Sequence, residues 1–222
     1  MPLHLSTALP GDDADPDVHL ARFDLSVALL HERVIAPAQA AARAVSPLAP
    51  LGFTGQTRHA VAVSGLRDLL LQLGWERNDD ENVARVRHVE RRLAIIVATG
   101  NALTGLPVSA TGRQPSTKWP KGDVTRAAAA DNEQLTLFDP ADASDGTTPE
   151  AHPPFATWYL LLRALEHEVR AELSHPLRVN PAGFIDRWSQ RILIRPLAND
   201  GTATDPDFGD EGDVPDVPIA PL

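Results

Sequence analysis

The sequence predicts an α+β protein in which N-terminal helices precede an antiparallel sheet built from two hairpins. Apolar residues in the first third of the chain recur at helical spacing, whereas later segments are short apolar runs rich in β-branched residues. The two kinds of segment do not alternate regularly, as they would in a parallel α/β sheet. With 222 residues, 43% of them hydrophobic, the chain is long and apolar enough to form one core.

Two helices are expected near the N-terminus. The first spans residues 18–35, because apolar residues three and four positions apart fall on one helix face; these are Leu20, Phe23, Val27, Leu30 and Val34. Pro37 is expected to end or kink it. A second helix is expected over residues 65–73, with Ser64 as its N-cap and Gly74 as its left-handed stop.

Strands are expected where the helical spacing of apolar residues gives way to short apolar runs. Each of two hairpins joins two short apolar segments through a polar turn; the four segments are residues 83–89, 93–99, 157–165 and 169–177. The continuous apolar run at 93–99 is typical of a buried strand. After the second hairpin, we expect residues 184–190 to form a short helix and 192–194 a final strand that ends before Pro196.

The net charge of −10 is concentrated at the two ends of the chain. Residues 1–17 carry four acidic residues and 199–222 carry seven, without any Lys or Arg, whereas residues 18–198 hold all 20 basic residues against 19 acidic ones. We expect both ends to be disordered acidic tails, because they have too little apolar surface to offset their ordering entropy. The remaining 18–198 form a single domain, interrupted by a long proline-rich connector at about 104–156.

Several classes of function are excluded by what the sequence lacks. The chain has no cysteine, which excludes a disulfide scaffold, a thiolate metal site and a cysteine nucleophile. No apolar run is long enough for a spanning helix, and residues 1–17 do not form a secretory signal, so we expect a bacterial cytoplasmic protein without a membrane partner. Neither a dinucleotide-binding nor a P-loop fingerprint is present, and we predict no cofactor.

One short motif within the connector points to a partner. Gln134-Leu135-Thr136-Leu137-Phe138 resembles the bacterial sliding-clamp-binding motif, whose usual form is Gln-Leu-small or acidic-Leu-Phe. The resemblance implies that Gln134 makes the polar contact and that Leu137 and Phe138 are the main anchors, with Leu135 beside them. The alternative is that these apolar residues dock on the protein's own sheet as a small edge strand.

A second segment of the connector is basic. Residues 112–126 have a net charge of +3 and include both lysines of the chain, Lys118 and Lys121, on either side of Trp119. Together with Arg113, these side chains suit a phosphate backbone and a stacked base, and we predict that the loop contacts DNA. The alternative is a solvated loop whose Trp119 packs over the sheet.

An enzymatic interpretation centres on the second hairpin, residues 157–178. Its candidate side chains are Glu166, His167, Glu168, Glu172 and His175, which would belong to a metal-dependent nuclease. No complete set of acids is identifiable there, so we assign no catalytic and no metal-binding residue. A third interpretation is an interaction module whose acidic tails occupy a nucleic-acid-binding partner.

The overall layout, rich in Ala, Arg and Pro, resembles that of proteins carried by prophages and integrative elements of high-GC proteobacteria. We therefore predict a non-enzymatic accessory protein of bacterial or mobile-element DNA metabolism. Its recruitment to the sliding clamp would depend on residues 134–138.

Overall fold

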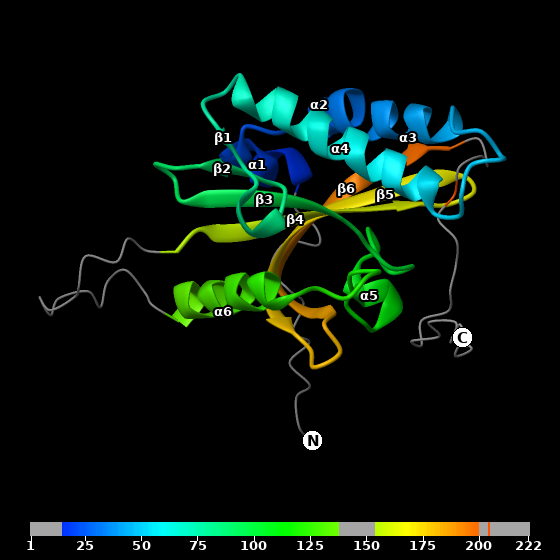
Figure 1. Cartoon of the computed structure of the whole chain (residues 1–222). Coiled ribbons are helices and arrows are strands. Elements are labelled where there is room, and N and C mark those ends of the chain that lie inside the picture. The colour runs from blue at the N-terminus through cyan, green and yellow to red at the C-terminus, as the bar shows by residue number, and fades with distance from the viewer. Residues whose placement is uncertain (1–14, 138–153, 200–203, 205–222) are drawn as a thin grey trace, which may run out of the picture.

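The computed structural model describes residues 15–137, 154–199 and 204, and over these residues the chain has the predicted α+β class. Helices cover both faces of one sheet (Figure 1). The six strands found in the described part lie side by side in chain order: β1 (Glu76–Asn78), β2 (Arg85–His88), β3 (Leu93–Thr99), β4 (Ala156–Ala164), β5 (Glu168–Val179) and β6 (Ile185–Ala198). The β2–β3 and β4–β5 hairpins confirm the two that were predicted.

The sheet is not wholly antiparallel, which corrects the prediction. β3 and β4 are parallel neighbours, with Leu93 opposite Ala156 and Thr99 opposite Leu162. A parallel pair needs a connection that returns along the sheet, and such connections usually carry a helix. Residues 100–155 make this crossover and include α5 (Val108–Thr111) and α6 (Asp123–Leu137). The segment predicted as a connector without secondary structure therefore contains a helix of 15 residues.

The first predicted helix is divided into several pieces. The N-terminal elements are α1 (Pro16–Leu20), η1 (Ala21–Phe23), α2 (Val27–Leu30), the π-helical η2 (His31–Ile35), α3 (Ala36–Arg43) and α4 (Phe53–Leu71), and a short η3 (Asp80–Asn82) follows. The break lies at Asp24, whose φ of 59° is left-handed, and the chain restarts when Ser26 caps α2 through the Leu29 N–H. The ordered helices begin at Pro16, inside the segment predicted as a tail.

Pro37 does not end the helical segment. It lies in the first turn of α3, directly after the π-helical turn. Proline has no N–H for the carbonyl four residues earlier, here Arg33, and its ring crowds that carbonyl in a regular α-helix. The wider π turn accommodates both constraints.

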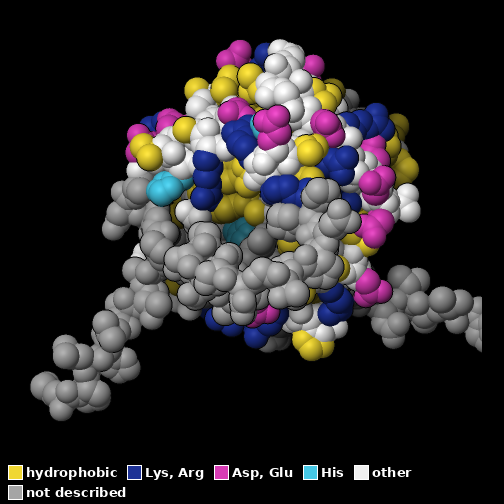
Figure 2. Space-filling view, turned by 90° about the vertical axis from the view of Figure 1, so that its left-hand side faces the viewer, with side chains coloured by type: hydrophobic (Ala, Val, Ile, Leu, Met, Phe, Trp, Pro, Cys, Tyr) yellow, Lys and Arg dark blue, Asp and Glu magenta, His cyan; other side chains and the backbone are white. Residues whose placement is uncertain are grey.

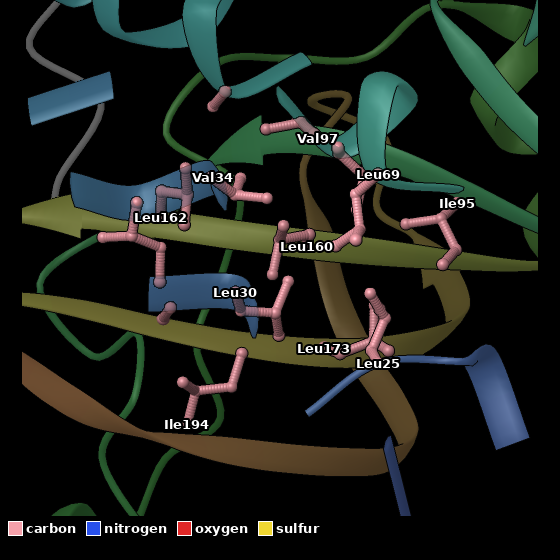
Figure 3. Packing of buried hydrophobic residues seen from close by; sticks show 14 of the residues in the cluster. Leu25, Leu30, Val34, Leu69, Ile95, Val97, Leu160, Leu162, Leu173 and Ile194 are labelled. Carbon is pink, nitrogen blue, oxygen red and sulfur yellow. The ribbon is translucent and has the colours of Figure 1, made fainter. Parts of the chain in front are cut away.

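Two apolar clusters lie on opposite faces of the sheet. The larger packs α1–α4 against alternate residues of the central strands, among them Ile95, Val97, Leu160, Leu162 and Leu173 (Figure 3). The smaller one lies on the face covered by α6 and contains Ile96, Ala98, Tyr159, Leu161, Ile185 and Trp188. Strands buried on both faces explain the continuous apolar runs of β3 and β4. None of the helices in the described part has the length and apolar character needed to cross a membrane.

The C-terminal strand differs most from its prediction. Residues 184–190 were expected to be helical, but Ile185 to Ala198 form one strand that passes through Pro196. Irregularities in the pairing with β5, around Pro176 and Arg178, insert extra residues into β6. Ile185 and Trp188 consequently lie on the same face although they are three positions apart, a spacing that mimics a helix.

The packing of α4 against η2 yields a test with two glycines of one helix. A Cβ on Gly65 would lie 2.4 Å from the backbone oxygen of Arg33, whereas a Cβ on Gly55 would meet nothing within 4 Å. We expect Gly65→Ala to destabilise the fold by about 1–3 kcal/mol. Gly55→Ala is expected to be neutral or to stabilise by up to about 1 kcal/mol, because alanine favours the helix. Urea denaturation of both variants measures the difference; equal effects would contradict the close approach.

Candidate partner-binding and nucleic-acid-binding sites

The basic loop is tied firmly to the end of the sheet. Thr117 forms an isolated bridge with Gly100, and the Lys118 N–H donates to the Thr99 carbonyl at 2.9 Å. From the other side, the Trp188 indole N–H donates to the Pro115 carbonyl at 2.8 Å. These bonds hold residues 114–118 in a fixed position beside β3 and β6.

The tip of the loop rests on the turn between β5 and β6. The Lys121 N–H donates to the Gly183 carbonyl at 2.6 Å, and a Cβ on Gly183 would lie 2.9 Å from Pro120. Gly183 also has a φ of 92°, so this position needs glycine on both counts. Arg126 donates to the carbonyls of Asn180 and Pro181, which assigns it to holding this turn.

The four side chains predicted to contact nucleic acid differ in accessibility. Arg113 is exposed, and Trp119 is 56% exposed, so Trp119 does not pack over the sheet as the alternative required. The Lys118 ammonium lies 5.6 Å from the centroid of the Trp119 ring. Lys121 is half-buried, and burial lowers the pKa of its ammonium group. An exposed ring with a cation beside it is suited to stacking on a base next to a phosphate.

The clamp-like motif begins in the last turn of α6 rather than in a loop. The helix continues to Leu137, so the backbone of Gln134, Leu135 and Leu137 is helical. The side chains of residues 134–137, and Phe138 altogether, lie outside the described residues. The motif was expected within a proline-rich connector, but its first four residues belong to the end of a helix.

A buried asparagine fixes the helix just before the motif. The Asn132 amide donates to the carbonyls of Thr157 and Pro176 at 2.9 and 3.0 Å, and its oxygen accepts the Thr157 N–H at 3.0 Å. Asn132 is fully buried, whereas the next residue, Glu133, is exposed. Three buried hydrogen bonds from one side chain anchor α6 to β4 and β5 at this point.

The acids of the second hairpin are engaged in ion pairs and do not converge. Glu168 pairs with Arg170, and Glu172 with Arg191. His175 lies on the other face of β5, against Trp158. Within the described ranges, no group of three His, Asp or Glu side chains could hold a metal ion. The geometry of these residues thus gives the nuclease interpretation no support.

The buried pair of Glu172 and Arg191 instead holds the crossover on the sheet. Their side chains are 0% and 1% exposed, and the Glu172 carboxylate also accepts from the Gly105 N–H and the Ser174 hydroxyl, both at 2.7 Å. Arg191 donates onward to the Leu106 carbonyl at 2.9 Å. Removing one charge from such a pair leaves the other buried without compensation. The pair therefore fixes the start of the segment that carries both candidate sites.

His175 forms a close pair with a serine. Its Nδ1 lies 2.6 Å from the Ser189 hydroxyl, and its ring centroid lies 4.8 Å from that of Trp158. Burial, with a further contribution from the Arg22 guanidinium, lowers the pKa of His175 to about 4. The imidazole is neutral at pH 7 and too weak a base to activate Ser189 efficiently. The geometry and the pKa therefore give no support to a catalytic role for this pair.

The lowered pKa of His175 predicts how stability depends on pH. The unfolded chain takes up a proton near pH 6.5, whereas the folded chain takes it up only near pH 4. This contribution to stability is complete above pH 6.5 and decreases by about 3 kcal/mol as the pH falls toward 4. His175→Gln should flatten the slope of unfolding free energy between these pH values. His167→Gln, at an exposed turn, should leave it unchanged, and an unaltered slope in His175→Gln would contradict the assignment.

Comparison with protein-family models, curated proteins and solved structures finds no match for this chain. The basic loop and the motif could be recognised in the sequence, whereas Asn132 and the Glu172–Arg191 pair could not. Asn132 stands among polar residues of a presumed connector, and only the parallel pairing of β3 with β4 brings it under the sheet. No local pattern in the sequence could have indicated that contact.

Proposed function

We propose that this chain is a non-enzymatic accessory protein of bacterial or mobile-element DNA metabolism that is recruited to the sliding clamp through residues 134–138. The observation that carries the proposal is the position of the motif: it starts two residues after Asn132, a buried residue that anchors α6 to the sheet. A linear motif at the end of an anchored helix begins at a fixed position, which reduces the conformational freedom that the motif loses when it binds its partner.

Binding in an extended form requires residues 134–137 to leave the helix. Unwinding loses at most the four bonds in which their N–H groups donate to carbonyls four residues earlier, because the last four carbonyls of a helix have no partner within it. Asn132 stops the unwinding before it reaches the sheet. The ordering of the freed peptide still lowers the affinity, so we expect dissociation constants around micromolar.

The clamp proposal predicts a loss of binding without a loss of stability. Leu137→Ala and Phe138→Ala should each remove an apolar anchor worth roughly 2 kcal/mol, a decrease in affinity of about thirtyfold. Leu51→Ala makes the same kind of change at a residue that is fully exposed in the α3–α4 connection, and it should leave clamp binding unaltered. Binding to a purified bacterial clamp and the melting temperature are measured on all three variants. A lowered melting temperature in the motif variants, with no binding by the wild-type protein, would support self-docking instead.

Contact with DNA through the basic loop is the second part of the proposal. Its support is the exposed Trp119 beside Lys118 on a loop that the sheet holds in place. Stacking of an exposed ring on a base contributes about 1–3 kcal/mol. Single-stranded DNA is the form whose bases are free to stack in this way.

Labelled oligothymidine and fluorescence anisotropy test this contact. Trp119→Ala should weaken binding roughly fivefold or more, and Lys118→Ala and Lys121→Ala should each weaken it and lower its salt dependence. Arg33→Ala removes one positive charge, already paired with Asp68, and should have little effect. A wild-type protein without affinity for the oligonucleotide at low salt would refute the contact.

A further inference from the structure

Arg22 has unusual surroundings for an arginine at the surface. Its guanidinium carbon lies 4.3 Å from the ring centroid of Trp158 and 4.6 Å from that of Phe23. Both rings are buried, so Arg22 covers the edge of the larger apolar cluster. A guanidinium that lies over aromatic rings keeps its N–H groups at the rim, available to a further partner.

The described structure provides Arg22 with only one polar partner, and that partner is neutral. Its Nη2 donates to the Gln190 side-chain oxygen at 3.0 Å. A guanidinium has five N–H donors, and no carboxylate of the described residues lies within ion-pair distance of this one. Burial accordingly lowers the pKa of Arg22.

The neighbouring carboxylates are used elsewhere. Asp24 forms an ion pair with Arg91 and accepts the Trp75 indole N–H at 2.8 Å. Asp17 accepts the Val27 N–H at 2.6 Å and lies 3.9 Å from Arg195. Arg22 is thus an exposed cation whose guanidinium has no counterion among the described residues, although two arginines close by in the fold have theirs.

An apolar patch lies on the surface at this end of the sheet. Figure 2 looks onto the side of the molecule where β4 begins, and it shows apolar side chains with Lys or Arg side chains at the upper edge of the patch. Beside Arg22, the Nδ1 of His175 is occupied by Ser189, and its Nε2 makes no hydrogen bond within the described part of the chain. A cation over aromatic rings, with a polar imidazole atom next to it, is the kind of site that receives a small anion.

We infer that Arg22 forms a phosphate-binding site together with Gln190 and His175, on the face of the sheet opposite α6. The ligand is a phosphate group, carried by a free nucleotide or by the backbone of a nucleic acid. Its oxygens would accept from the free N–H groups of Arg22, the Gln190 amide and the Nε2–H tautomer of His175. This inference does not depend on the clamp motif or on the basic loop.

The experiment follows the His175 imidazole by NMR in the full chain, with the resonance assigned through His175→Gln. Inorganic phosphate, thymidine monophosphate and oligothymidine are titrated in separate arms. Bound phosphate neutralises Arg22, so each ligand that binds should shift the resonance and raise the pKa of His175. A response to the oligonucleotide alone identifies a nucleic acid backbone as the source of the phosphate, and a response to the mononucleotide identifies a free nucleotide.

Matched variants separate a specific site from general charge attraction. Arg22→Gln should weaken phosphate binding by about tenfold or more, and Arg22→Lys should restore it only in part, because an ammonium lacks the planar fork. Arg195→Gln removes the same charge nearby from an arginine that is near Asp17 and should change the affinity less than twofold. The inference is overturned if none of the three ligands shifts the His175 resonance, or if Arg22→Gln and Arg195→Gln weaken the response equally.

Discussion

The parallel pairing of β3 with β4 is the constraint on which the rest of the structure depends. It requires residues 100–155 to return along the sheet, and this places the basic loop and α6 on the face opposite α1–α4 (Figure 1). The Glu172–Arg191 pair holds the start of this crossover, and Asn132 holds its helix. Both proposed contacts, with the clamp and with DNA, come from this one segment. An antiparallel arrangement of the same strands would need no such segment.

The sequence allowed the strands of the two hairpins to be predicted because each is a short run of β-branched or alternating residues. It did not allow their order in space to be predicted, since the pairing of β3 with β4 joins residues about sixty positions apart. The prediction for β6 was wrong for a local reason. The pairing irregularities place Ile185 and Trp188 on the same face of the strand, three positions apart, which is the spacing of a helix. The helix α6 was not predicted because residues 127–130 are all alanine and the residues after them are polar, so that no apolar stripe marks a helix. Its buried face includes the polar residues Thr125 and Asn132.

The candidate sites also differ in whether their residues could be predicted from the sequence. Trp119 and the two lysines could be found in the sequence because they lie close together in one loop, where Trp119 is exposed and both lysines are partly buried. Arg22, Trp158 and His175 could not, because they lie on three separate elements that meet only in the folded protein. The hairpin acids suggested the alternative nuclease interpretation for the opposite reason. They are close along the chain, yet alternation along β5 puts Glu172 and His175 on opposite faces, each with its own partner.

Hydrogen exchange of the full chain, alone and with a purified bacterial sliding clamp, tests the central claim most directly. The account predicts that amides after Asn132, through residue 138, exchange rapidly in the free protein and become protected when the clamp is added. Amides of β4 and β5, which Asn132 bridges, should be protected in both states. Unchanged exchange at residues 133–138 in the presence of clamp, or protection that appears only elsewhere in the chain, would contradict recruitment through this motif.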